Sequence, residues 1–582
     1  MRVRFRYIWK RNDGISLNGL FKEGRLKGGT LSPSLQIGKG AETMERETET
    51  TLTVLETSDV HGHIFPVNYG TNAYAGLGMA KIATLVKEIR RKEKNVLLID
   101  NGDNIQGTPL TYHYVKFMSG EMNPVVKVMN HLRYDAAVVG NHEFNYGMEV
   151  LERAVGQSDF PWLSANLLDK GTGEPYFGKP YIIKLFEGGL KVAVLGLTTH
   201  YIPNWEKPEH IRSLRFEDTV ESAKRWVKKI RAEEKPDVLV LSYHGGFERD
   251  PDTGAPDEAE TGENVAYRLC MEVEGIDCLL TGHQHRKIWG KTINGVVVLQ
   301  PGCNGQYLGK ATIRLKKAEG RWTIIGKRSE ILPLENVPED REVIRLCEKY
   351  EEATQKWLDR PIGRIEGDMT IKDPFEARVK EHPFIELINR VQMEASGADI
   401  SGTALFHDEV KGFRHEVTMR DIVSSYVYPN TLVVLKITGK DLKAALERSA
   451  SYFCLNEKGE LAINPAFSHP KPQHYNYDMW EGIEYVIDVS KPVGERVVRL
   501  TYKNQKVEDD QELLVVINNY RASGGGEYTM FKNREVVREI QTDMTELLAN
   551  YFLEKKTVKA VCNHNWEVRT GDGEGLHPEN RI

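Results

Sequence analysis

Cysteine is scarce in this sequence, with six residues among 582. None of them form the close pairs that zinc ribbons and redox motifs require. A disulfide framework is not expected at so low a density. Zinc-finger and disulfide-scaffold proteins are therefore excluded. The six stand at Cys270, Cys278, Cys303, Cys347, Cys454 and Cys562.

Long apolar stretches are also lacking. Segments such as Asn95–Asp100 fall well short of the ~18–20 residues that a helix needs to cross a bilayer. We therefore expect no membrane partner. Residues 1–43 are basic but contain no apolar core or cleavage site of a secretory signal. We expect a cytoplasmic location, with an exported or cell-surface protein as the alternative. Because Met44 precedes the first expected strand, we interpret residues 1–43 as an untranslated or disordered extension.

No charge of one sign dominates. The 78 basic and 84 acidic residues leave a net charge of -6, which supplies no strong positive field for a polyanion. A nucleic-acid polymer is therefore not an expected partner. With 40% hydrophobic and 28% charged residues, the composition is that of a folded protein. The length exceeds what one hydrophobic core usually serves, so two or more domains are expected.

From about residue 51, short apolar runs alternate with helical stretches, which is typical of α/β proteins. In the stretch 80–93, Ile82, Leu85, Val86 and Ile89 recur at three- and four-residue steps and predict a helix. A second helix is expected at 219–232. The runs between such helices are apolar throughout, which predicts strands covered on both faces. These strands are expected at 52–57, 96–100, 136–139, 192–197, 238–242, 278–280 and 296–300.

A charged stretch at 338–358 without turn signals predicts a connecting helix. Beyond residue 360 the pattern changes to mixed strands and helices, which indicates a second domain. Strands are expected there at 433–437, 485–488 and 513–518, and a helix at 442–449. The predicted organisation is an extension at 1–50, a first domain at 51–335, a connecting helix at 336–360, a second domain at 361–560 and a loose tail at 561–582.

Residues that bind metals follow five of the expected strands. In α/β proteins, ligands bind just outside the carboxyl ends of the strands. Seven oxygen and imidazole ligands arriving there could form two adjacent metal sites that share one carboxylate. A single histidine would more often be a hydrogen-bonded structural residue, but five such clusters favour a metal centre. The clusters are Asp59-Val-His61, Gly102-Asp103, Gly140-Asn-His-Glu143, Tyr243-His-Gly245 and Gly282-His-Gln-His285.

Taken in this order, the clusters resemble those of the calcineurin-like metallophosphoesterases. The resemblance implies an N-terminal four-layer αββα catalytic domain with two divalent metal ions. His142 matches the catalytic histidine of that family, which interacts with the scissile phosphate and the leaving oxygen. His63 matches no family position and is expected to be structural. One metal would take Asp59, His61, Asp103 and His285, and the other Asp103, Asn141, His244 and His283, with Asp103 as the bridge.

The second domain resembles the substrate-binding domain of the 5′-nucleotidase family in segments 424–432, 437–442 and 518–526. The resemblance implies an α+β domain in which two aromatic rings clamp the base. Tyr428 and Tyr520 match those positions, and both lie beside turns rather than within apolar periodicity. Stacking of a base on an aromatic ring contributes ~1–3 kcal/mol and tolerates different bases. A nucleotide is therefore the expected substrate.

Two departures from the 5′-nucleotidase pattern indicate which branch of the family the sequence resembles. Asn145 and Gly526 stand where that pattern has aspartates. Both residues resemble the 2′,3′-cyclic-nucleotide 2′-phosphodiesterase/3′-nucleotidase branch, which implies release of nucleoside and phosphate in nucleotide catabolism. An amide cannot neutralise an imidazolium as a carboxylate would. A role of His142 in holding the phosphate is therefore better supported than a role as general acid.

Three alternatives remain open. A 5′-nucleotidase or nucleotide-sugar hydrolase would use the same metal ligands. A non-catalytic nucleotide-binding protein could keep the same fold, although retention of every metal ligand argues against it. A phosphoprotein phosphatase is disfavoured by the second domain. The mixed imidazole, carboxylate and amide ligands suit Mn, Zn, Fe or Co without selecting among them, and the oligomeric state is left open.

Overall fold

The computed structural model describes residues 48–571, apart from 205, 207, 258, 259, 429 and 541. The extension inferred at 1–43 lies outside the described residues. Its predicted end at residue 50 is wrong, because β1 (Thr48–Thr57) already begins at Thr48. Residues 48–50 pair with β15 (Tyr307–Ala318). The hydrogen-bonded pairing continues beyond the buried part of β1 into the polar residues 48–51. These residues contain no apolar run that would predict a strand.

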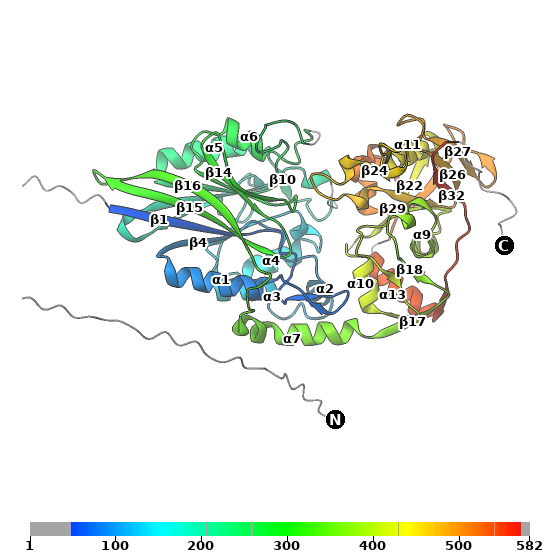
Figure 1. The fold of residues 1–582 in the computed structure, drawn as a ribbon, viewed down its shortest axis with the longest axis horizontal. Helices are drawn as coiled ribbons and strands as arrows, with labels where there is room; N and C mark the ends of the chain where they lie inside the picture. The colour runs from blue at the N-terminus through cyan, green and yellow to red at the C-terminus, as the bar shows by residue number, and fades with distance from the viewer. Residues whose placement is uncertain are drawn as a thin grey trace, which may run out of the picture. The chain divides into compact units, whose positions relative to one another are not determined.

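Two six-stranded sheets form the frame of the first domain (Figure 1). In each sheet, parallel strands occupy the centre and antiparallel strands lie at an edge. The first sheet has the order β16 (Arg321–Pro333), β15, β1, β4 (Asn95–Asp100), β5 (Ala136–Val138) and β6 (Trp162–Leu163). The second has the order β13 (Lys287–Ile293), β14 (Val296–Pro301), β12 (Cys278–Thr281), β11 (Val238–His244), β9 (Lys191–Thr198) and β8 (Tyr181–Leu185).

Alternating side chains of these strands build two kinds of core. In β4, Leu97 and Ile99 pack between the two sheets, whereas Val96 and Leu98 face the outer helices. This follows from the period of two in a strand. The predicted four-layer αββα architecture is therefore confirmed. The first sheet is covered by α1 (Met79–Lys92), α2 (Pro109–Phe117), α3 (Pro124–Leu132) and α4 (Met148–Gly156), and the second by α5 (Thr219–Glu233) and α6 (Ala266–Glu272).

All seven strands and both helices predicted for this domain are present, with ends that differ by a few residues at most. The antiparallel pair β15 and β16 was not among them. Both strands are rich in Lys and Arg and are partly exposed along their length. They therefore lack the continuous apolar run by which the other strands were recognised.

The predicted connecting helix is confirmed as α7 (Arg341–Leu358). It begins after Asp340, whose side chain accepts from the backbone N–H groups of Glu342 and Val343, as an N-cap aspartate does. Its buried positions, Val343, Cys347, Tyr350, Thr354 and Leu358, recur at three- and four-residue steps. This stripe packs along α1, α2 and α3 of the first domain, so α7 is anchored rather than free.

The second domain is α+β, as predicted. One sheet has the order β25 (Asp478–Glu481), β19 (Ile400–Ala404), β29 (Glu512–Asn518), β22 (Leu432–Thr438) and β30 (Glu535–Ile540). Another has the order β28 (Gln505–Lys506), β27 (Val497–Tyr502), β26 (Glu484–Asp488) and β32 (Trp566–Arg569). The main helices that pack on them are α9 (Pro383–Ser396), α11 (Gly439–Ala450) and α13 (Met544–Lys555).

The prediction of a loose tail from residue 561 is wrong for β32. This strand pairs in parallel with β26, and its Trp566 is buried and stacks on Tyr485 with ring centroids 5.7 Å apart. The segment is short and polar around Trp566, so its partner strand, some eighty positions earlier, supplies the structure. Residues beyond 571 lie outside the described part of the chain.

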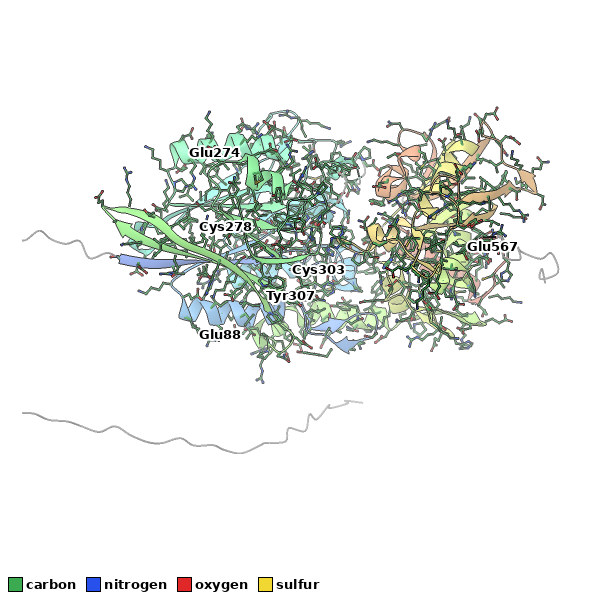
Figure 2. The ribbon with its side chains drawn as sticks, turned by 45° about the horizontal axis from the view of Figure 1, so that its top comes forward. Glu88, Glu274, Cys278, Cys303, Tyr307 and Glu567 are labelled. Carbon is green, nitrogen blue, oxygen red and sulfur yellow. The ribbon has the colours of Figure 1, made fainter. Side chains whose placement is uncertain are left out.

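Glu56 is an acidic side chain buried in the interior of the first domain. Glu56 of β1 is fully buried, and neither carboxyl oxygen has a hydrogen-bond partner among the described residues. Its charge acts on Cys278, which is labelled in Figure 2. Burial, followed by the charges of Asp59 and Asp100, raises the pKa of Glu56 well above its usual value. The fold therefore favours the protonated form of this carboxyl, and the stability linked to that proton is lost as pH rises above the unfolded pKa.

We predict that Glu56→Gln removes this pH dependence. Relative to the unchanged protein, the unfolding free energy of the variant should rise from pH 5 to pH 8 by up to about 1 kcal/mol per pH unit. Urea unfolding in chelator at four pH values measures the difference. Glu49→Gln, an exposed position on the same strand, serves as the control and should give a flat difference. A flat difference for Glu56→Gln would show that Glu56 is ionised in the fold.

Candidate metal centre and adjoining cavity

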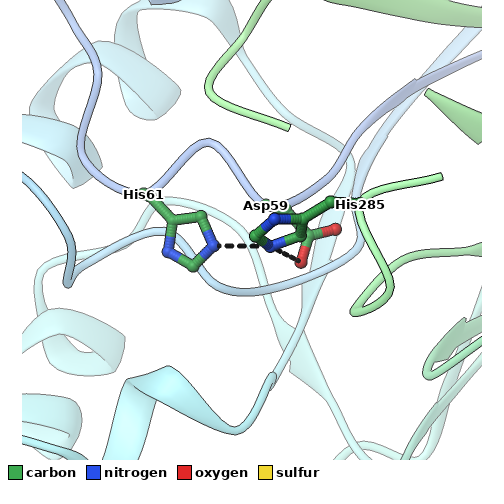
Figure 3. A group of neighbouring side chains, drawn as sticks. All are labelled: Asp59, His61 and His285. Atoms are coloured by element: carbon green, nitrogen blue, oxygen red, sulfur yellow. Dashed lines mark hydrogen bonds and ion pairs between the residues drawn. The ribbon is translucent and has the colours of Figure 1, made fainter. Parts of the chain in front are cut away.

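Three predicted ligands meet at the carboxyl ends of β1 and β12. The ligand atoms of Asp59, His61 and His285 lie within 4.8 Å of one another (Figure 3). His61 Nε2 is 3.1 Å from His285 Nε2, which in turn is 3.5 Å from Asp59 Oδ1. Asp59 is fully buried, so its carboxylate needs a cation or proton in this position.

The second group gathers four predicted ligands. Asp103, His244 and His283 have ligand atoms within 4.8 Å of one another, and His244 Nε2 is 3.3 Å from Asp103 Oδ2. Asn141 Oδ1 joins them at 3.1 Å from His244 Nε2 and 2.9 Å from His283 Nδ1. The structure therefore brings all seven predicted ligands into two groups of the predicted membership, with Asp103 found in the second.

Asp103 also lies next to the first group. Its backbone carbonyl accepts from the backbone N–H of His61 at 2.9 Å, and its negative charge acts on both His61 and Asp59. This position suits a carboxylate shared by two cations. The bridging role itself stays a prediction.

Hydrogen bonds behind the groups orient three of the imidazole rings. His61 Nδ1 donates to the Gln106 carbonyl, and His244 Nδ1 donates to the Asn101 carbonyl at 2.6 Å. Since a carbonyl only accepts, the Nδ1 proton is fixed and Nε2 of each ring faces the group. His283 is turned the other way, because its Nε2 donates to Glu263 at 2.8 Å. Such contacts are typical behind metal-binding histidines, whose tautomer they set.

Backbone strain is concentrated at these positions. Five of the seven predicted ligands have φ between 49° and 66°, a region that non-glycine residues seldom adopt and that costs about 1–3 kcal/mol each. Asp and His adopt this conformation more readily than most residues, but the surrounding fold must still hold five such positions together. The five are Asp59, His61, Asp103, His283 and His285.

Burial tunes the imidazoles toward the neutral form that binds metals. It lowers the pKa of His61 to about 3 and that of His283 to about 4. Desolvation by the surrounding protein and then the charge of His61 also lower the pKa of His285 below its usual value. His244 differs: burial opposes its charge, but Asp103 raises its pKa to about 10. Without a cation His244 therefore carries a proton, which a metal ion would have to displace.

His142 lies beside the two groups but belongs to neither. Its backbone N–H donates to Asp103 Oδ1 at 2.8 Å, and its Nδ1 donates to Asn145 Oδ1 at 2.7 Å. Asn145 Nδ2 in turn donates to Glu206 at 3.0 Å. The Asn145 amide, which replaces the family's aspartate, therefore links His142 to the carboxylate of Glu206 through two hydrogen bonds. His63, by contrast, bonds to the Val60 carbonyl and takes part in neither group.

A cavity of about 510 Å³ adjoins the metal-ligand groups. His142, Tyr428 and Tyr520 all line it. The Tyr428 ring packs edge-on against Phe406 and lies nearly parallel to His142, with centroids 6.2 Å apart. Because both tyrosines are only partly buried, each has a face that a bound molecule can contact. Their role as a base clamp stays a prediction.

Gly526 of the same cavity accounts for one departure from the family pattern. It has φ of 69°, and a Cβ atom there would lie 2.1 Å from Asn476 Oδ1 and 2.4 Å from an Arg521 guanidinium nitrogen. An aspartate could not occupy this position without displacing both side chains.

Several residues of the site escaped the sequence analysis. Glu143 was quoted only as part of a motif, yet it is fully buried and accepts from the backbone N–H groups of Gly140 and Asp103. Glu206 and Glu263 lie in irregular segments with no motif around them. They reach the site through long-range contacts, which no local sequence signal could reveal.

Comparison with known proteins agrees with this architecture. The model of the calcineurin-like phosphoesterases matches residues 52–287, and that of the 5′-nucleotidase C-terminal domain matches residues 361–533. The first family implies binding of divalent metal ions. The nitrogen, carboxylate and amide donors of the two groups fit such ions. None of the helices in the described part of the chain combines the length and apolar character needed to cross a bilayer.

Individual relatives extend the match over most of the chain. The sequence is 30% identical to the 2′,3′-cyclic-nucleotide 2′-phosphodiesterase/3′-nucleotidase of Salmonella typhimurium, covering 81% of each protein. It is 28% identical to the trifunctional nucleotide phosphoesterase YfkN of Bacillus subtilis, covering 91% of this chain but 40% of that longer protein. The structure of a 5′-nucleotidase candidate from Staphylococcus aureus, solved with alpha-ketoglutarate, superposes with a TM-score of 0.83 at 35% identity, covering 90% of this chain and 100% of that one. The chain therefore belongs to the 5′-nucleotidase family of calcineurin-like metallophosphoesterases.

Proposed function

We propose that this protein is a metal-dependent nucleotide phosphohydrolase that acts as a 2′,3′-cyclic-nucleotide 2′-phosphodiesterase and 3′-nucleotidase in nucleotide catabolism. One observation carries the proposal: a single cavity is lined by His142, by histidines of the metal-ligand groups and by Tyr428 and Tyr520. A reacting phosphate and a nucleobase would thus share one binding space. The Salmonella relative and the residues Asn145 and Gly526 support this branch of the family.

Two divalent cations, of Mn, Zn, Fe or Co, would be held by the seven ligands, with Asp103 between them. When bound, such a pair activates water and stabilises negative charge on phosphoryl oxygens. His142 Nδ1 donates its proton in a hydrogen bond to Asn145. Nε2 is therefore the nitrogen available to the phosphate or leaving oxygen. Hydrolysis of the P–O2′ bond would leave a 3′-nucleotide. Hydrolysis of the remaining ester would release nucleoside and phosphate.

Steady-state kinetics after metal reconstitution tests the proposal. We expect turnover of 2′,3′-cAMP and 3′-AMP and much slower turnover of 5′-AMP. Preference for 5′-AMP would instead identify a 5′-nucleotidase, which the Staphylococcus relative makes the second candidate. Absence of metal-dependent turnover, including that of bis(4-nitrophenyl) phosphate, would favour a nucleotide-binding protein. The cytoplasmic location stays a prediction from the sequence.

The base clamp gives a prediction that separates nucleotide recognition from general phosphoesterase activity. Tyr428→Ala or Tyr520→Ala should raise KM for 3′-AMP about 5- to 150-fold, the equivalent of ~1–3 kcal/mol of stacking. Turnover of bis(4-nitrophenyl) phosphate, which has no base, should change much less. A folding defect would lower both activities together. An unchanged KM for 3′-AMP in both variants would contradict the nucleotide-specific proposal.

A further inference from the structure

One loop of the second domain carries a cation to the metal-ligand groups. The loop 464–477 connects β24 (Leu461–Ile463) to β25. Lys471 Nζ on this loop donates to the backbone carbonyl of His283 at 3.3 Å. Two residues earlier, His469 Nε2 is 3.3 Å from Asp257 Oδ1 of the first domain. The loop is therefore held against the first domain at two points, and Lys471 lies beside a predicted metal ligand.

The other cations that line the cavity are placed differently. Arg448 donates to the Gly526 carbonyl at 3.0 Å and pairs with Glu527 at 3.1 Å. Lys532 is exposed and donates to Asn204 at 3.3 Å. Lys471 is half-buried, and no carboxylate of the described residues forms an ion pair with it. Its ammonium is therefore free of a direct carboxylate partner, although the charge of Glu263 acts on it from the same cavity.

Lys471 lines the cavity together with a tyrosine of the predicted base clamp and a predicted metal ligand. Burial raises the pKa of Tyr428, and the Lys471 charge opposes that rise. Lys471, Tyr428 and His283 all line the same cavity, and Lys471 Nζ donates to the His283 carbonyl. Lys471 thus lies close to a clamp tyrosine and to a metal-ligand histidine at the same time. A phosphate placed between base and metals would come within its reach.

We propose that Lys471 forms an anion subsite for the phosphomonoester and favours the dianionic 3′-phosphate over the monoanionic cyclic diester. The proposal rests on the proposed function and assigns its second step to a specific side chain. A phosphomonoester has a second pKa near ~6 and is mostly dianionic at pH 8, whereas the cyclic diester bears a single charge. Coulomb attraction to one ammonium scales with the charge of the ligand. The monoester also offers a terminal oxygen for a charge-assisted hydrogen bond.

Kinetics of Lys471→Met at pH 8 on both substrates tests this subsite. We expect kcat/KM for 3′-AMP to fall about 10- to 100-fold, the range for a hydrogen bond to a charged group. For 2′,3′-cAMP the fall should be less than about 5-fold, since only the smaller Coulomb attraction to a monoanion is lost. Lys471→Arg should restore most of the 3′-AMP activity. Lys458→Met, which removes the same charge from an exposed turn, should change neither substrate.

Two further measurements exclude a merely structural effect. Inhibition by adenosine, which has no phosphate, and metal content should both be unchanged in Lys471→Met. An equal fall on both substrates, an unchanged substrate ratio or loss of metal would overturn the proposal.

Binding of inorganic phosphate tests the subsite without turnover. Calorimetry on the metal-reconstituted protein at pH 8 should show binding about 10- to 100-fold weaker in Lys471→Met. If the unchanged protein hydrolyses neither nucleotide, the proposed function fails, whereas this titration still decides the subsite. Equal phosphate affinity in the two proteins would reject it.

Discussion

Replacing Asp103 by Asn is expected to abolish more activity than any other single change among the metal ligands. Asp103 is fully buried, lies 3.3 Å from His244 Nε2, and adjoins the group of Asp59, His61 and His285. An amide keeps the shape but removes the negative charge that would lie between the two cations. We expect kcat/KM to fall by more than about 10³-fold, because a dinuclear centre contributes several kcal/mol to the reaction.

Metal content by mass spectrometry, measured together with turnover, checks this result. Fewer than two metals per chain should remain in Asp103→Asn. Asp252→Asn, an exposed carboxylate of the same domain that pairs with Lys291, should retain both metals and normal turnover. Two retained metals with a near-normal rate in Asp103→Asn would show that Asp103 is not the bridge.

His142→Ala is expected to separate catalysis from metal binding. The side chain lines the cavity and is held by Asn145 rather than by either ligand group. Removing a group that stabilises charge in the transition state usually costs about 10²–10³ in kcat. We expect a loss of this size with metal content unchanged. Kinetics on 3′-AMP, with metal analysis of the same preparation, measures both quantities.

His564→Ala provides the matched control, because His564 is exposed, does not line the cavity and belongs to none of the candidate metal-ligand groups of the described residues. It should leave both kcat and metal content unchanged. Loss of metal in His142→Ala would make His142 a ligand and would contradict its assignment. An additional variant, Asn145→Ala, should lower kcat by a smaller factor, since it removes only the contact that orients the ring.

The sequence was sufficient to predict the two domains and the α7 connection, and it placed the candidate metal-ligand residues directly after their strands. The physical reason is local. Each central strand is a continuous apolar run because it is covered on both faces, and each run ends directly before its ligand. Asp59, Asp103 and His283 could therefore be placed just beyond the carboxyl ends of their strands from the topological rule for α/β proteins. These predictions therefore depended only on residues that are adjacent in the sequence.

Features that depend on partners distant in the sequence were decided only by the tertiary structure. The strand β32 exists because β26 offers an edge and Tyr485 a ring for Trp566. The pair β15 and β16 extends a sheet with largely polar residues. Its stability comes from the ladder rather than from apolar periodicity.

The surroundings of the ligands were likewise set by the fold. Glu206 compensates for the amide at Asn145, Glu263 turns the ring of His283, and Lys471 brings a positive charge from the second domain. Each of these side chains lies in an irregular segment. Sequence patterns report which residues a local element buries, whereas a hydrogen bond or charge contributed by a distant loop leaves no local periodicity. The sequence by itself thus determined which residues are predicted as ligands, and the tertiary structure decided how their side chains are oriented and charged.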